Sequence, residues 1–151
     1  MYHKILVPLD GSELAECVLP HVEAIVQGSD SCEVMLLHVV EPLHTGGFDD
    51  FIDVDAIRDT LVSKAEEYLL KTQSQLARHG WSIRAEVRKG GRPASIIVDF
   101  AKENEVDLIV IATHGHSGIS RWVYGSVADK VVRSASTPVL LIRPTACEVG
   151  I

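Results

Sequence analysis

The sequence predicts an α/β domain built on a five-stranded parallel sheet with about four helices. Short apolar runs, typical of buried strands, alternate along the chain with longer segments whose apolar residues recur every three or four positions, which is typical of amphipathic helices. Strands that alternate with helices favour a parallel sheet covered on both faces. The length of 151 residues favours one domain. We assign it to residues 1–144 and treat 145–151 as a C-terminal tail.

The first strand is expected at Lys4–Leu9. Pro8 should lie near the end of this strand, because proline has no N–H to donate to a neighbouring strand. Residues 10–12, Asp-Gly-Ser, then predict a turn, in which Ser12 caps the helix that follows.

Residues 13–28 predict that first helix, and we expect Pro20 to kink it rather than end it. The apolar run 34–40 predicts the second strand. The second helix is expected over residues 52–79, after a loop rich in glycine and acidic residues. Residues 81–87 alternate between apolar and polar with period two, so they predict a half-exposed strand at a sheet edge.

The last third of the chain contains the most distinctive pattern. Pro93 suits the first position of a third helix. The buried strand 107–112 leads into a loop with several glycines, followed by a helix over 126–134 and a last strand over 138–143. Glycine lets backbone N–H groups approach a phosphate closely, and the first N–H groups of a helix lack internal partners. The loop and helix start therefore predict a phosphate site.

Composition and charge narrow the functional classes. The net charge of −7 argues against nucleic acid as the main partner. No apolar run approaches the roughly 18–20 residues that span a bilayer, and the N-terminus lacks the layout of a signal peptide. Cys17, Cys32 and Cys147 are an odd count without metal-site spacing, so we expect buried reduced thiols. These features predict a cytoplasmic protein without a membrane partner.

Several motifs carry a family resemblance along residues 2–144: KILVPLDGS, LLHVVEP, a Gly-Arg-Pro helix start, ATHGHSG, YGSVADKVVR and TPVLLIRP. With them the chain resembles the universal stress protein family. The resemblance implies a Rossmann-like, adenine nucleotide alpha hydrolase-like sheet with strand order 3-2-1-4-5. The family's ATP-binding pattern is glycine, two residues, glycine, nine residues, then Gly-Ser or Gly-Thr. Gly115, Gly125 and Ser126 match its later elements, and Ala112 stands in place of the first glycine.

The resemblance implies a site for ATP, or for ADP, AMP or cyclic AMP, with or without Mg²⁺. Its implied residues fall into a nucleoside group (Pro8, Asp10, Val39, Ile111 and Ala112) and a phosphate group (Gly115, Gly125, Ser126 and Val127). In this view the Gly125 N–H faces the phosphates, and Gly125→Val should block them while leaving the fold intact.

Three of these residues also have a plainer interpretation. Asp10 could simply cap its own turn, Ser126 could be an ordinary N-cap, and Val39 could belong only to the core. His114 and His116 flank a glycine, but without further ligands at recognisable spacing they favour an exposed pair over a metal site.

We therefore expect a stress-response nucleotide-binding regulator rather than an enzyme, with at most slow ATP hydrolysis. An apolar edge strand invites pairing with a second copy, and the resemblance implies a homodimer formed through Val139–Arg143. One alternative is a dimeric interaction module that binds no nucleotide, which Ala112 keeps open. The other is a slow ATP hydrolase.

Overall fold

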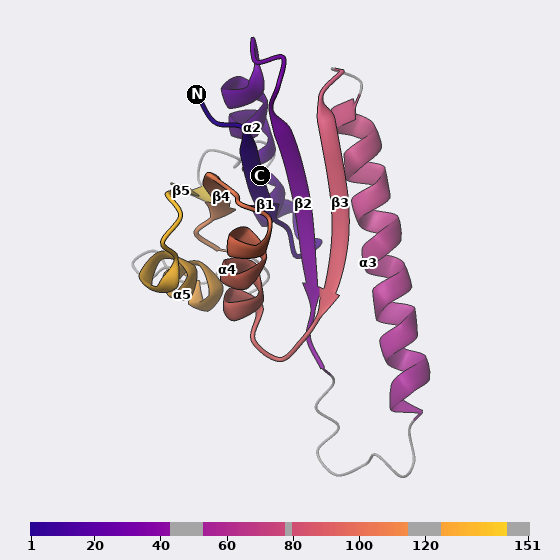
Figure 1. The fold of residues 1–151 in the computed structure, drawn as a ribbon. Helices are drawn as coiled ribbons and strands as arrows, with labels where there is room; N and C mark the ends of the chain where they lie inside the picture. Colours follow the sequence, from indigo (N-terminus) through magenta and orange to yellow (C-terminus); the bar gives the residue numbers. More distant parts are fainter. Residues whose placement is uncertain (43–52, 78–79, 115–124, 145–151) are drawn as a thin grey trace.

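A computed structural model of the chain describes residues 1–42, 53–77, 80–114 and 125–144. Its centre is a five-stranded parallel sheet in the order β3-β2-β1-β4-β5 (Figure 1), which confirms the predicted fold class and strand order. The strands are β1 (Lys4–Pro8), β2 (Glu33–Val40), β3 (Ser82–Lys89), β4 (Leu108–Ala112) and β5 (Val139–Ile142). The helices are α1 (Glu13–Glu16), α2 (Leu19–Val26), α3 (Val54–Ala77), α4 (Pro93–Glu103) and α5 (Ser126–Ser134).

Helices cover both faces of the sheet because successive residues of each strand point to opposite sides. In β1, Ile5 and Val7 pack into the core formed with α1, α2 and α3. Leu6, between them, packs into the core formed with α4 and α5. In Figure 1, α3 lies along β3 while α4 and α5 lie on the other side of the sheet. None of the helices within the described residues is long and apolar enough to cross a membrane.

The first helical segment differs from expectation. The prediction of one helix with a kink at Pro20 is wrong: α1 ends at Glu16 and α2 begins at Leu19. Pro20 therefore lies in the first turn of a new helix, where its missing N–H has no intrahelical acceptor to lose. Ending one helix and starting another costs less free energy than one continuous helix would. This is because a proline inside a helix removes a hydrogen bond and crowds the preceding turn.

The remaining elements follow the sequence pattern closely. β3 is an edge strand with alternating exposure near its start, as its period-two pattern predicts. Ser12 caps α1, and its hydroxyl accepts the Ala15 N–H at 3.2 Å. α3 covers residues 54–77 of the expected 52–79, and the ends of that range lie outside the described residues, as does most of the expected loop before it. β5 is shorter than the expected 138–143.

The expectation of three reduced thiols is wrong at Cys17, which is disulfide-bonded. Its sulfur lies 3.9 Å from the carbonyl oxygen of Pro144, just after β5, a proximity that residues 127 positions apart cannot reveal by spacing. Cys32 is a buried free thiol, and burial, followed by the charges of Asp107 and Glu33, raises its pKa. Cys147 lies outside the described residues.

The strand order reverses at the centre of the sheet. β1 pairs with β2 on one side and with β4 on the other. In open parallel sheets this reversal leaves a crevice beyond the carboxyl ends of the two central strands. At the opposite ends, the Asp107 carboxylate accepts the N–H groups of His3 (2.8 Å) and Lys4 (3.1 Å), which fixes β1 against β4.

We expect Asp107→Ala to lower the free energy of unfolding by about 1–2 kcal/mol, because two backbone N–H groups lose a carboxylate acceptor. Urea unfolding followed by circular dichroism measures this change. Asp99→Ala is the matched control, since Asp99 is exposed on α4, and it should change stability by no more than about 0.5 kcal/mol. Equal losses in the two variants would contradict a role for Asp107 in joining the central strands.

Candidate functional site

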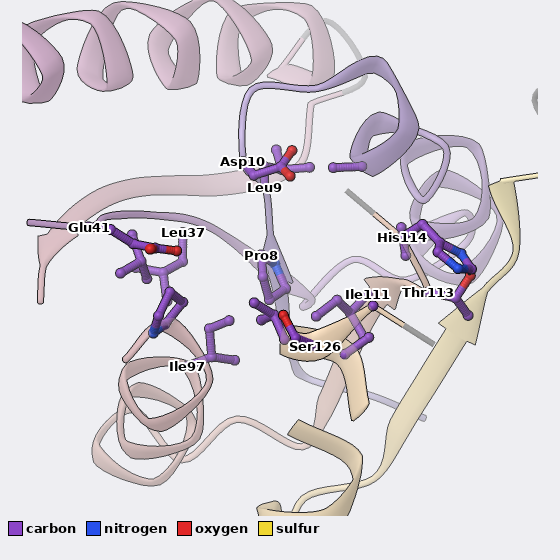
Figure 2. Close-up of a pocket in the computed structure, with 17 residues that line it drawn as sticks. Pro8, Leu9, Asp10, Leu37, Glu41, Ile97, Ile111, Thr113, His114 and Ser126 are labelled. Carbon is purple, nitrogen blue, oxygen red and sulfur yellow. The ribbon is translucent and has the colours of Figure 1, made fainter. Parts of the chain in front are cut away.

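A cavity of about 260 Å³ opens beyond the carboxyl ends of β1 and β4 (Figure 2). Its size lies slightly below the roughly 300–1,000 Å³ typical of small-molecule sites. Every predicted site residue that lies within the described residues lines it: Pro8, Asp10, Val39, Ile111, Ala112, Gly125, Ser126 and Val127. Gly115, the ninth, lies outside the described residues. Positions from four separate parts of the chain thus converge on one cavity.

Apolar side chains line one end of the cavity, where Glu41 also lies (Figure 2). Leu37 and Val39 enter it from β2, and Pro93 and Ile97 enter it from α4. Val39 also packs against the core cluster on the α4 side of the sheet. Val39 therefore packs against the core and also lines the cavity, so it does not belong only to the core. A flat apolar ring is the chemistry that suits this end of the cavity.

Asp10 lies at the cavity wall and also organises its own turn. Its Oδ1 accepts the Ser12 N–H at 2.9 Å and the Ser12 hydroxyl, so the turn interpretation holds. Gly11, between them, has φ +85°, a conformation that side chains rarely adopt. A carboxylate has about four acceptor sites, so these bonds do not fill its capacity to accept hydrogen bonds from a ligand.

α5 points its first turn at the cavity. Ser126, Val127 and Ala128 line the cavity and occupy the first three helical positions, where N–H groups have no intrahelical acceptor. The N-cap residue, Gly125, has no side chain with which to cap this end of α5, and the helix dipole adds partial positive charge there. The arrangement can receive an anion.

The same geometry corrects two expectations. The Gly125 N–H does not face the cavity as a donor, because it donates to the Thr113 carbonyl at 2.6 Å. Gly125, not Ser126, is the N-cap of α5. Ser126 is the first helical residue, and this makes its N–H, like its hydroxyl, a candidate donor.

Gly125 is needed here for close approach. A Cβ at Gly125 would lie 2.8 Å from the Thr113 carbonyl oxygen. Ala112 needs no such freedom: among the described residues other than glycine, positive φ is recorded only at Glu105. Alanine therefore replaces the first glycine of the family pattern without backbone strain.

Thr113 and His114 are cavity residues that our reading of the sequence did not assign. Thr113 is almost fully buried, its N–H donates to the Ile142 carbonyl at 2.9 Å, and its hydroxyl lies 2.9 Å from His114 Nδ1. Their position in the sequence could have identified them, because both follow directly after a buried strand, and ligands bind beyond the carboxyl ends of strands in open parallel sheets. No cluster of metal-ligating side chains occurs among the described residues, and His116 lies outside them.

Tyr68 of α3 holds α1, and with it the Asp10 turn, against the sheet. Its hydroxyl donates to Glu16 at 3.0 Å. Burial, then the negative charge of Glu16 and that hydrogen bond, and the charge of Asp10 raise the pKa of Tyr68 far above its ordinary value. The phenol therefore stays a neutral hydrogen-bond donor at physiological pH.

Comparisons with known proteins agree with this geometry. The model of the universal stress protein family matches residues 1–143. Universal stress protein MJ0531 of Methanocaldococcus jannaschii is 33% identical over 143 residues, covering 95% of this chain and 83% of that protein. The solved structure of hypothetical protein MJ0577, from the same organism, superimposes with a TM-score of 0.83 at 29% identity, covering 95% and 96% of the two chains.

A more distant structure, a universal stress protein family protein from Arabidopsis thaliana with AMP bound, has a TM-score of 0.68. It is 20% identical to this chain, and the match covers 93% of this chain and 90% of that one. At this identity it shows a shared fold alone.

We expect Gly125→Ala to lower the free energy of unfolding by about 1–3 kcal/mol, because the added methyl group overpacks against the Thr113 carbonyl. The earlier expectation that Gly125→Val would leave the fold intact is corrected by the same 2.8 Å contact. Urea unfolding measures the change. Gly91→Ala is the control: its Cβ would meet only Pro42 Cγ at an ordinary 3.9 Å, so its stability should stay level or rise slightly.

Proposed function

The chain belongs to the universal stress protein family, and on that premise we propose that it binds an adenine nucleotide, including ATP, in the cavity beyond β1 and β4. We propose that binding serves a stress-response regulator of the cytoplasm rather than a dedicated enzyme. The observation that carries this proposal is the first turn of α5, which lines a cavity whose other end is lined by apolar side chains of β2 and α4.

The phosphates would lie at α5. Backbone N–H groups of Ser126 and Val127, with the Ser126 hydroxyl, supply donors at the positive end of a helix. Gly115 would add to the residues that contact the phosphates. Mg²⁺ could accompany the bound phosphates. Gly125 contributes by bringing α5 against Thr113 rather than by donating its own N–H.

The nucleoside would lie toward β1 and β2. Asp10 can accept hydrogen bonds from ribose hydroxyl groups, while Val39 can offer backbone groups to the base edge. Pro8, Ile111 and Ala112 supply apolar contact beside them. The Arabidopsis thaliana protein with AMP bound supports the proposal to the extent that this fold accommodates an adenine nucleotide. ADP, AMP and cyclic AMP remain candidate ligands with ATP.

Binding rather than catalysis is the better proposal. Asp10, a carboxylate of the cavity wall, is already engaged by Ser12 through its Oδ1, which makes it a poor general base. Any ATP hydrolysis should be slow.

We propose a homodimer formed through Val139–Arg143. β5 is the edge strand beside β4, and an edge strand has one side on which its backbone can pair with another chain. Leu140 is 37% exposed on β5 and Val132 is 42% exposed on α5, so apolar surface is present near this edge.

We expect ATP to raise the unfolding free energy by about 2.7 kcal/mol at a hundred times its Kd, measured as a rise in melting temperature. Ser126→Pro removes one N–H. It should fold normally, because proline suits the first helical position and Gly125, at φ −55° and ψ 151°, already has the backbone that precedes a proline. ATP affinity measured by calorimetry should fall about tenfold or more, as for a lost hydrogen bond to a charged group.

Ser126→Ala is the matched control, since it removes the hydroxyl but keeps the N–H, and it should lose less affinity than Ser126→Pro. Equal affinity for Ser126→Pro and wild type would contradict the phosphate position. Flat melting curves with ATP, ADP, AMP and cyclic AMP would favour the nucleotide-free dimer, and many turnovers of ATP would favour the hydrolase.

We expect Leu140→Lys to shift the protein from dimer toward monomer, because the substitution places a charge on an apolar edge that pairing would bury. Sedimentation equilibrium over a range of protein concentrations measures the dissociation constant. Leu70→Lys is the control, as Leu70 is 59% exposed on α3, far along the sheet from β5. An unchanged dimer in Leu140→Lys would place the interface elsewhere.

A further inference from the structure

We infer that Glu41 selects the base of the bound nucleotide, favouring purines that carry a 6-amino group. The inference rests on the proposed function and extends it to a residue of the LLHVVEP motif to which neither the family's ATP-binding pattern nor the sequence assigned a role. Glu41 follows β2 directly and lines the cavity.

The backbone brings Glu41 to the apolar end of the cavity. Alternate residues of an extended chain share a face, and Leu37 and Val39 both face α4 and the cavity. Glu41 is the next residue in this row. In Figure 2 it lies toward Leu37 and Ile97, at the end of the cavity away from Thr113 and His114.

The charges of the cavity orient the ligand. Phosphates are attracted to the first turn of α5 and repelled by the Glu41 carboxylate. α4 also begins at this end, but its first residue, Pro93, has no N–H to donate, and Ala94 and Ser95 do not line the cavity. The base therefore belongs at the Glu41 end.

At that end Glu41 adds a side-chain acceptor to the backbone groups that Val39 can offer to the base edge. The neighbouring side chains of Leu37, Val39 and Ile97 have no hydrogen-bonding atoms, and a carboxylate accepts hydrogen bonds without donating any. Within the described part of the chain no hydrogen bond or ion pair is recorded for the Glu41 carboxylate. A 6-amino group would donate to it, whereas a hydrogen atom at this position leaves the carboxylate unpaired and a carbonyl oxygen is repelled.

The test compares ATP with purine riboside triphosphate, which lacks only the 6-amino group, by calorimetry on the full chain. Wild type should bind the analogue about tenfold more weakly than ATP, as expected for a charged hydrogen bond at a partly solvated site. In Glu41→Ala this ratio should fall to about twofold or less. Glu67→Ala removes the same charge from an exposed position on α3 outside the cavity and should keep the wild-type ratio.

Using the ratio within each variant separates base recognition from charge. Loss of a negative charge from the cavity changes the affinities for both triphosphates alike, so it cancels in the ratio. If wild type binds both ligands equally, or if Glu41→Ala keeps the preference for ATP, the role of Glu41 is overturned and the proposed function stands. If wild type binds neither, the proposed function fails and this inference fails with it.

Discussion

The hydrogen bond from the Gly125 N–H to the Thr113 carbonyl is the contact on which the candidate site depends. It joins the start of α5 to the end of β4, although ten residues of the loop between them lie outside the described part of the chain. Only glycine permits it, because a Cβ would lie 2.8 Å from the same oxygen. This contact fixes the start of α5 beside the end of β4, where Ser126, Val127 and Ala128 line the cavity.

The other walls of the cavity follow from the reversal of strand order. β1 and β4 are neighbours, so the turn after β1, with Asp10, and the segment after β4, with Thr113, open at the same edge. Tyr68 fastens α1 from behind by donating to Glu16. The cavity thus has a positive end at α5, an apolar end between β2 and α4, and carboxylates at Asp10 and Glu41. This polarity suits an elongated ligand with an anion at one end and a flat ring at the other.

The predictions that failed did so for one of two reasons. Either another local conformation had a lower free energy, or a residue far along the chain made the deciding contact. Pro20 was expected to kink a helix, yet a break followed by a new helix costs less than a proline in a helix interior. Cys17 was expected to be reduced, but its surroundings include Pro144, far along the chain. The Gly125 N–H was assigned to a ligand, whereas a carbonyl on a neighbouring element accepts it. None of these competitors is visible in a local pattern.

The sequence by itself determined the α/β class, the sheet covered by helices on both faces, the turn after β1 and the family. It could do so because apolar periodicity, turn residues and short motifs are local properties. It also named eight residues that line one cavity. Only the tertiary structure decided which N–H groups remain available there, why Ala112 is tolerated, and that Glu41 joins the apolar end. These features depend on distances between elements remote in the chain, which packing fixes and local sequence does not encode.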